Sequence, residues 1–437
     1  MQDNRDSGAF GRLLKTSTKI ETREFGAALL SFGFVFILMA AYFMLRPVRD
    51  AMASDWSDVE VSTLWSMTFF LSLIAVTVYG AVISKVRFRW LVPGVYVFFA
   101  ASFFVFYFGS TYATDTVLVD KSFYVWLSVF SLFHVSVFWS FMSDLWSREQ
   151  APRLFGFIAM GASVGAIVGP LSTALLVERI GAENLMLVSA TMLLVPIPII
   201  FTLARLKVSA LDNEDVSADL GAQQAIGRNP FAGFSIFLTS PYLIGIGIFI
   251  ILYVAIGSFV YFELKNLLAD FSREDRTQIW AYIDFAVNSL TIITAMFLTS
   301  RIATRFGMPT TLALIPALIV IGMLVIAISP VVAVVAGLQV ARRAGNYAIT
   351  RPGREMLFTA VDRETRFKAK PVIDIVLYRG GDMLTAWAFT LLTTGFGLGL
   401  GAVAAVGAVI AALWAVTGVY LGNAYNRLAS ANIEAEQ

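Results

Sequence analysis

The sequence contains no cysteine and only one histidine, His134. Disulfides and thiolate metal sites both require cysteine, so its absence excludes them, and one histidine cannot form a cluster for zinc or iron. We expect no metal and no cofactor. His134 is expected to be a buried, hydrogen-bonded side chain, with a proton relay as the alternative role.

Patterns of common catalytic sites are also missing. The chain has neither the GxxxxGK[ST] pattern of a phosphate-binding loop nor the HExxH pattern of a zinc protease. Its polar stretches are too short to form a soluble catalytic domain. We therefore expect that the protein is not an enzyme, with an intramembrane enzyme as the alternative.

Charge is scarce as well. Charged residues make up 14% of the chain and hydrophobic residues 58%, whereas soluble domains have about 25% and about 45–50%. The net charge of +2 is too small to indicate nucleic-acid binding. A membrane-spanning helix needs about 20 apolar residues to cross a hydrocarbon core of roughly 30 Å, and such runs recur along the whole chain. The sequence predicts an all-α, polytopic membrane protein whose surface contacts lipid.

Apolar runs bounded by charges, glycine or proline predict about twelve spans, six in each half. Between the halves, the polar stretch 205–231 contains the helix-breaking Asn229-Pro230 pair and is expected to be an exposed connector. We place the spans at residues 26–45, 61–84, 90–110, 122–143, 155–177, 185–204, 242–262, 278–300, 310–329, 331–350, 372–396 and 400–422. The domains are then a 1–24 segment, a 25–204 half, the 205–231 connector, a 232–425 half and a 426–437 tail.

Positive charge gathers on one side of this arrangement. Five Lys and Arg precede the first span, three lie between residues 85 and 89, and six between Arg351 and Lys370. Because cytoplasmic loops carry an excess of Lys and Arg, we expect the N-terminus, the connector and the C-terminus in the cytoplasm of a bacterial inner membrane. The first 24 residues lack the apolar region of a secretory signal, so we expect this segment to be retained.

The two halves resemble each other. A shift of about 215 residues places Ser147-Arg148-Glu149 on Asp362-Arg363-Glu364, Gly165 on Gly380, and Arg46–Asp50 on Tyr261–Lys265. These matches fall at equivalent helix ends, as a duplicated six-helix unit predicts. Two pseudo-symmetric six-helix halves joined by a cytoplasmic connector resemble the major facilitator architecture.

Charged residues inside the predicted spans are the strongest functional signal. A charge at membrane depth costs about 2.5–3.5 kcal/mol on insertion scales, so it normally faces a partner or a wet cavity. Two guanidinium groups three positions apart can both bind the oxygens of one anion. The predicted substrate-binding residues are Arg46, Arg49 and Asp50 at the end of the first span, Glu263 and Lys265 at the end of the seventh, Arg343 and Asn346 in the tenth, and Asp374, Arg379 and Asp382 in the eleventh.

Each cluster has a simpler alternative. Arg46 and Arg49 can extend to the membrane interface, and Glu263 can pair with Lys265 at a helix end. The tenth span can end before Arg342 and Arg343, and the charges of the eleventh span can neutralise one another. Loop charges are expected to form a cytoplasmic gate of breakable ion pairs between the halves: Asp144, Arg148 and Glu149 with Asp362, Arg363 and Glu364.

Three segments are similar to the ATP/ADP translocase family. They are Leu45–Asp50, Tyr261–Lys265, and Arg351–Phe358 continuing through Asp362–Glu364 to Arg379-Gly380. The resemblance implies nucleotide exchange, with Arg49 and Glu263 at two of the family's functional charges. The chain departs from the family at Asp382, where a lysine is usual, and in its fourth span, which has no acidic residue.

These observations predict a secondary active transporter that works by alternating access. Its substrate is expected to be a small anionic molecule, with nucleotide exchange implied by the resemblance. Proton-coupled transport, or flipping of a lipid or precursor that is not a nucleotide, is the alternative. We expect a monomer.

Overall fold

The computed structural model describes residues 21, 23–83, 88–147, 149–209, 211, 232–361, 369–370 and 372–436. These residues form helices joined by short turns, with no strand among them, and this confirms the predicted all-α class. Ten helices in this part of the chain are long and apolar enough to cross a membrane. Since a chain with this many apolar spans must place them in lipid, the protein is a multi-pass membrane protein.

The chain folds into two compact units. Unit 1 contains Met1–Arg49 and Leu71–Gln224, and unit 2 contains Asp50–Phe70 and Ala225–Gln437. Near the N-terminus, the chain passes from unit 1 to unit 2 after Arg49 and returns to unit 1 after Phe70. Both of these positions lie inside helices. The last turn of α2 (Phe25–Met52), the short η1 (Ala53–Asp55) and the first half of α3 (Asp58–Ile83) belong to unit 2.

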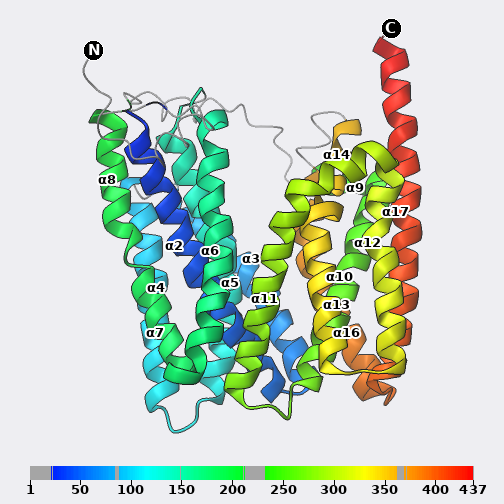
Figure 1. Cartoon of the computed structure of the whole chain (residues 1–437), viewed down its shortest axis with the longest axis horizontal. Helices are drawn as coiled ribbons and strands as arrows, with labels where there is room; N and C mark the ends of the chain where they lie inside the picture. The colour runs from blue at the N-terminus through cyan, green and yellow to red at the C-terminus, as the bar shows by residue number, and fades with distance from the viewer. Residues whose placement is uncertain are drawn as a thin grey trace. The chain divides into compact units, whose positions relative to one another are not determined.

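Unit 1 is built from α2, the second half of α3, and five further helices. In Figure 1, α2, drawn in dark blue, lies among the cyan and green helices of this unit. Within the unit, α4 packs against α5, α7 and α8. The predicted span 185–204 lies within the candidate span Ala182–Lys207, which a turn at residues 193–195 divides into α7 and α8. The five further helices are α4 (Phe88–Tyr112), α5 (Val117–Leu145), α6 (Ala151–Ile180), α7 (Ala182–Met192) and α8 (Pro196–Ser209).

A glycine stripe on α6 brings its backbone close to α2. A Cβ added to Gly169 would lie 2.6 Å from the Ala40 carbonyl oxygen, and the same atoms of Phe32 and Phe36 block Gly161 and Gly165. Small residues at four-residue spacing permit such close helix approach in membranes. Residues 161–165 also have GxSxG spacing, but they lie within α6 rather than at the strand-to-helix turn that a nucleophilic serine requires.

Unit 2 is built around α10 (Pro241–Leu267), which packs against α13, α16 and α17. Its N-terminus is capped by the Ser240 hydroxyl, which accepts a hydrogen bond from the Leu243 amide. In the same unit α11 packs against α13, and α12 packs along α17, as Figure 1 shows in yellow-green to red. The remaining long helices are α11 (Arg273–Phe297), α12 (Thr299–Ile328), α13 (Val332–Gly345), α16 (Tyr378–Thr390) and α17 (Leu400–Glu436), with the short α9 (Ala232–Thr239) before α10.

The predicted tenth and eleventh spans are helical but irregular. The tenth continues from α13 through a π-helical turn, η4 (Asn346–Thr350), into α14 (Arg351–Leu357). The helix therefore continues past its two arginines. The eleventh runs from the π-helical η6 (Val372–Leu377) through α16 into η7 (Leu391–Gly395). Both contain several charged residues, which is why neither is among the ten most apolar helices.

Candidate functional site

The first predicted cluster lies on α2, which continues through Pro47. Arg46 and Arg49 therefore occupy one helical face, as their spacing predicts. The Arg49 guanidinium donates to the Ser128 hydroxyl at 3.2 Å and lies 5.5 Å from the centre of the Tyr124 ring, both on α5. The Arg46 guanidinium lies 5.8 Å from the centre of the Phe43 ring. Both arginines are half-buried within unit 1.

The two arginines of α13 have different partners. Arg343 forms an ion pair with Asp284 on α11 at 2.5 Å, and both side chains are buried. Arg342 points to α10, where its guanidinium lies 5.7 Å from the centre of the Tyr253 ring. It donates to the Gln339 side-chain oxygen at 2.8 Å and is also buried. Adjacent residues on a helix point about 100° apart, which accounts for this division.

Arg342 forms no ion pair with a carboxylate among the residues that the structure describes. The acidic side chain whose charge acts on it is Asp382 of α16, which interacts with both Arg379 and Arg342. Arg379 is 3.9 Å from Asp382, and both are partly exposed. The described side chains of this group thus carry two guanidinium charges against one carboxylate. Asn346 is buried in the π-helical turn that follows α13, and the Asp374 side chain lies outside the described residues.

The charges at the end of α10 do not pair with each other. Lys265 binds Asp58 of α3 at 3.0 Å and donates to the Trp56 carbonyl oxygen at 2.7 Å. Glu263 is fully buried, and neither of its carboxyl oxygens has a hydrogen-bond partner in the described part of the chain. The alternative of a Glu263–Lys265 pair is therefore wrong.

Asp50 belongs to a different unit from the arginines with which the sequence grouped it. The boundary between the units falls between Arg49 and Asp50. Within unit 2, Asp50 is buried and accepts a hydrogen bond of 3.5 Å from the Tyr261 hydroxyl of α10. The predicted segment Arg46–Asp50 thus supplies residues to both units.

His134 is a buried side chain of α5, as expected. Its Nδ1 lies 3.3 Å from the Phe130 carbonyl oxygen of the same helix, and its ring is 4.5 Å from the centre of the Tyr42 ring. Its Nε2 has no hydrogen-bond partner among the described residues. One nitrogen near a backbone oxygen fits a structural histidine, and no described contact continues a proton path from it.

The predicted cytoplasmic gate falls largely outside the described residues. Arg148, Asp362, Arg363 and Glu364 are not among them, and Glu149 is exposed. Asp144 binds Lys207 of α8 at 2.9 Å, which is a contact within unit 1. The pairing of these charges between the halves stays a prediction.

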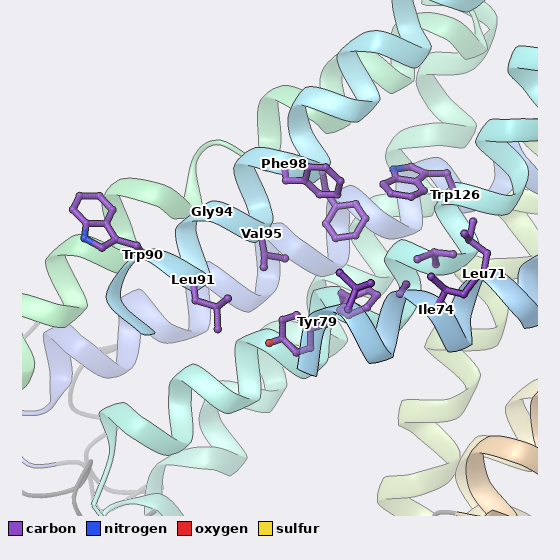
Figure 2. A pocket seen from close by; sticks show the side chains of 14 residues that line it. Leu71, Ile74, Tyr79, Trp90, Leu91, Gly94, Val95, Phe98 and Trp126 are labelled. Carbon is purple, nitrogen blue, oxygen red and sulfur yellow. The ribbon is translucent and has the colours of Figure 1, made fainter. Parts of the chain in front are cut away.

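Unit 1 also contains an apolar cavity of about 540 Å³ between α3, α4 and α5. Figure 2 shows the 14 residues that line it, with Trp90 and Trp126 at opposite ends. None of these 14 side chains carries a formal charge, and the indole nitrogen of Trp126 already donates to Ser102. Nothing in this lining would bind an anion, so we do not assign the substrate to it.

Sequence reasoning missed four charges that the structure places in the clusters. Asp284 and Arg276 lie on α11, and Asp55 and Asp58 lie between the first two spans. Each is buried or paired: Arg343 binds Asp284, Arg276 binds Asp55 and Lys265 binds Asp58. Asp284 was detectable, because it is a lone acid in an apolar run. The other three, Arg276, Asp55 and Asp58, are close to loops, where charged residues are common.

Two helical units with ionisable residues on their membrane helices define a polytopic membrane protein of the transporter type. The sequence matches the family model of the Major Facilitator Superfamily over residues 29–349. The chain therefore belongs to the Major Facilitator Superfamily, and it is a membrane transporter. Among curated proteins, no sequence matches the chain.

Solved structures show the same fold. The crystal structure of a bacterial homologue of the human lysosomal transporter Spinster, inward-facing and unoccupied, gives a TM-score of 0.55 at 12% identity and covers 94% of this chain and 97% of that one. The crystal structure of the nucleoside transporter NupG gives a TM-score of 0.57 at 13% identity and covers 92% of this chain and 99% of that one. Neither the family model nor these structures supports the narrower resemblance to the ATP/ADP translocases.

Proposed function

We propose that this transporter carries a small anionic solute by alternating access, and that Arg342 binds the anion. The choice of an anion depends on one observation. Arg342 is a buried guanidinium in a membrane helix, and no described carboxylate forms an ion pair with it. A buried charge without a partner is costly, so a binding site for the opposite charge is the simplest reason to keep one.

The depth of Arg342 in its helix supports this proposal. It lies ten residues after Val332, where α13 begins. At about 1.5 Å per residue this corresponds to roughly 15 Å, which is half of a hydrocarbon core of about 30 Å. An arginine that only extended to the membrane interface would lie near a helix end. A position at this depth suits a residue that binds a substrate crossing the membrane.

The neighbours of Arg342 also suit an anion. Gln339 holds one side of the guanidinium through its Nε and Nη2 atoms, at 3.3 Å and 2.8 Å. A Cβ added to Gly257 of α10 would lie 3.0 Å from Nη1, so the absence of a side chain at this glycine lets the guanidinium pack against α10. A planar guanidinium can bind two oxygens of a carboxylate or phosphate at once. Arg379 adds a second positive charge on α16.

Unit 1 contributes its own candidates. Arg46 and Arg49 share one face of α2 and are half-buried. Arg49 donates a hydrogen bond to the Ser128 hydroxyl at 3.2 Å. We propose that these two arginines bind substrate during part of the transport cycle.

Uptake into proteoliposomes tests the proposal. Labelled carboxylates, sugar phosphates and nucleotides are compared with neutral and cationic solutes, for the wild type and for Arg342→Gln. A hydrogen bond to a charged group contributes about 1.5–3 kcal/mol, so we expect Arg342→Gln to reduce uptake of the anion about ten- to hundredfold. Arg301→Gln, at an exposed arginine of α12, is the matched control and should keep the wild-type rate. Uptake of a neutral or cationic solute that is independent of Arg342 would rule out the proposal.

Nucleotide exchange is the second candidate. Its support is the similarity of Leu45–Asp50, Tyr261–Lys265 and Arg351–Phe358 to the ATP/ADP translocases. Labelled ATP is offered to vesicles that contain ADP and to empty vesicles. Uptake that requires internal ADP and is lost in Arg49→Ala would support exchange, whereas uptake into empty vesicles driven by a pH gradient would support proton coupling.

The proposed orientation places both termini and the connector in the cytoplasm. It is supported by the excess of Lys and Arg in residues 1–24 and 351–370. Reporter fusions after residue 24 and after residue 428 should both be active in the cytoplasm. Activity of either fusion on the other side of the membrane would reverse the orientation.

A further inference from the structure

Among the described residues, Gln339 of α13 is the hydrogen-bond partner of Arg342. Its side-chain oxygen accepts from Nε at 3.3 Å and from Nη2 at 2.8 Å. The two residues are three positions apart, so they lie on the same face of α13, and they are 3% and 5% exposed. Asp382 acts on Arg342 through its charge and is not hydrogen-bonded to it. The side chain that fixes this buried guanidinium is therefore neutral.

The orientation of the Gln339 amide follows from the chemistry of its partner. A guanidinium has donors and no acceptor, so the amide has to turn its oxygen toward Arg342. The NH2 group occupies the other branch of the same planar group and therefore faces away from the guanidinium. Both hydrogen bonds that the described residues make with Gln339 use the oxygen, and none uses the nitrogen. A donor on a buried side chain normally has an acceptor, which a bound substrate can supply.

The other sides of the guanidinium face α10. The ring of Tyr253, itself buried, lies 5.7 Å from the guanidinium carbon. Nη1 lies over Gly257, where an added Cβ would be 3.0 Å away, and it takes part in no hydrogen bond with the described residues. Two donor groups of this one pair are thus unused in the described part of the chain, Nη1 of Arg342 and Nε2 of Gln339. An acid group with two oxygens can accept from two such donors at once.

A purely structural role for Gln339 would be better served by glutamate. The two side chains have nearly the same shape, and a carboxylate would hold a buried guanidinium through stronger, charge-assisted hydrogen bonds. It would also neutralise the positive charge and present an acceptor where the amide presents a donor. Glutamine instead fixes Arg342 without neutralising it, which suits a guanidinium that binds an anion.

We propose that Gln339 determines the specificity of this site for anions. Its oxygen positions Arg342, its neutrality leaves the guanidinium charge to the substrate, and its NH2 group donates to a second oxygen of the same anion. The substrate class narrows to molecules with at least two oxygens on one acidic group, which are carboxylates and phosphates. This inference deepens the proposed function and rests on the part of it that assigns the anion to Arg342.

Thermal unfolding in detergent at neutral pH, without substrate, tests the contact itself. Gln339→Glu is compared with the wild type, alone and combined with Arg342→Gln. We expect the single variant to melt about 2–4 °C higher, because the new carboxylate pairs with Arg342. In the Arg342→Gln background the same change should give no gain. Gln278→Glu, the same chemical change at a half-buried position of α11, is the control and should not depend on Arg342. An equal effect of Gln339→Glu in both backgrounds would overturn the inference.

Uptake into proteoliposomes, with the labelled carboxylates, sugar phosphates and nucleotides used for Arg342→Gln, tests specificity. We expect Gln339→Glu to take up the wild-type anion at least about tenfold more slowly although it is more stable, a combination that a purely structural role would not give. Gln339→Met, which keeps the length of the side chain without its polar atoms, should raise the half-saturation concentration more than it lowers the maximal rate.

The two proposals fail in different ways. Wild-type uptake by a stabilised Gln339→Glu protein would overturn the role of Gln339. If Arg342→Gln has then lost uptake, the role of Gln339 alone fails, and if Arg342→Gln also keeps the wild-type rate, the anion proposal fails with it. Absence of anion uptake by the wild-type protein would count against the proposed function, whereas the coupling of Gln339 to Arg342 is measured without substrate.

Discussion

Replacing Lys265 by methionine should destabilise unit 2 by removing one member of a nearly buried ion pair. The exposed fractions of the two side chains are 2% for Lys265 and 10% for Asp58, and their charged atoms are 3.0 Å apart. Methionine keeps the length and most of the volume of lysine, so the packing against Phe262 changes little. The substitution therefore tests charge rather than shape.

The distance sets the scale of the effect. At 3.0 Å the attraction between the two charges is about 5.5 kcal/mol with an effective dielectric constant of about 20. The cost of removing both ions from water offsets much of this, yet breaking a buried pair by removing one partner typically costs about 3–5 kcal/mol. The hydrogen bonds from Asn266 and Thr393 still stabilise Asp58 in the variant, so we expect a value near the lower end, about 3 kcal/mol.

Unfolding in mixed detergent micelles, followed by tryptophan fluorescence, measures this loss. Asp58→Asn and the double variant Asp58→Asn/Lys265→Met complete a double-mutant cycle. We expect the double variant to lose less than the two single losses added together, because it leaves no unpaired buried charge. Strictly additive losses would show that the two residues are not coupled, and would refute the reasoning.

Two further predictions concern packing and pH. Gly169→Val should lower the free energy of unfolding by about 1–3 kcal/mol or more, because its Cβ would lie 2.6 Å from the Ala40 carbonyl oxygen; thermal unfolding of the variant tests this. Burial alone would raise the pKa of Glu355, but hydrogen bonds from Arg354 and Lys370 outweigh it and lower the pKa below 4.5. A lowered pKa stabilises the fold above pH 4.5 and ceases to do so as the pH falls through the folded-state pKa. Glu355→Gln should therefore unfold more easily than the wild type at neutral pH and equally easily in acid, and a difference that persists in acid would contradict this.

The sequence was sufficient for the fold because membrane insertion leaves few alternatives. Apolar runs such as 242–262 and 400–422 are long enough to span and too apolar to be exposed, and both are helices in the structure. The ends of the helices were less predictable. The first span was predicted to end at residue 45, but α2 extends to Met52 and includes the charged residues Arg46, Arg49 and Asp50. The predicted span 185–204 is interrupted by a turn before Pro196.

The candidate site was predicted in its residue types but not in its pairing. Charges in apolar runs are conspicuous, and this identified Arg343 and Glu263, whereas the adjacent Arg342 was not among the predicted substrate-binding residues. Partners from other helices cannot be read from one sequence, because they are set by the packing of α10, α11 and α13. Thus Asp284 was missed as the partner of Arg343, and Lys265 was grouped with Glu263 although it binds Asp58.

The π-helical turn at Asn346–Thr350 also affects how this chain can be aligned with its relatives. A π turn holds about one residue more than an α turn, so the helix after it is offset by one position from a relative that lacks the turn. An α-helix rotates about 100° per residue. An alignment without a gap here would therefore match Arg351 and Arg354 to residues on a different face. At 12–13% identity too few identical residues remain to reveal that error, so helix contacts rather than residue matches have to set the register of α14.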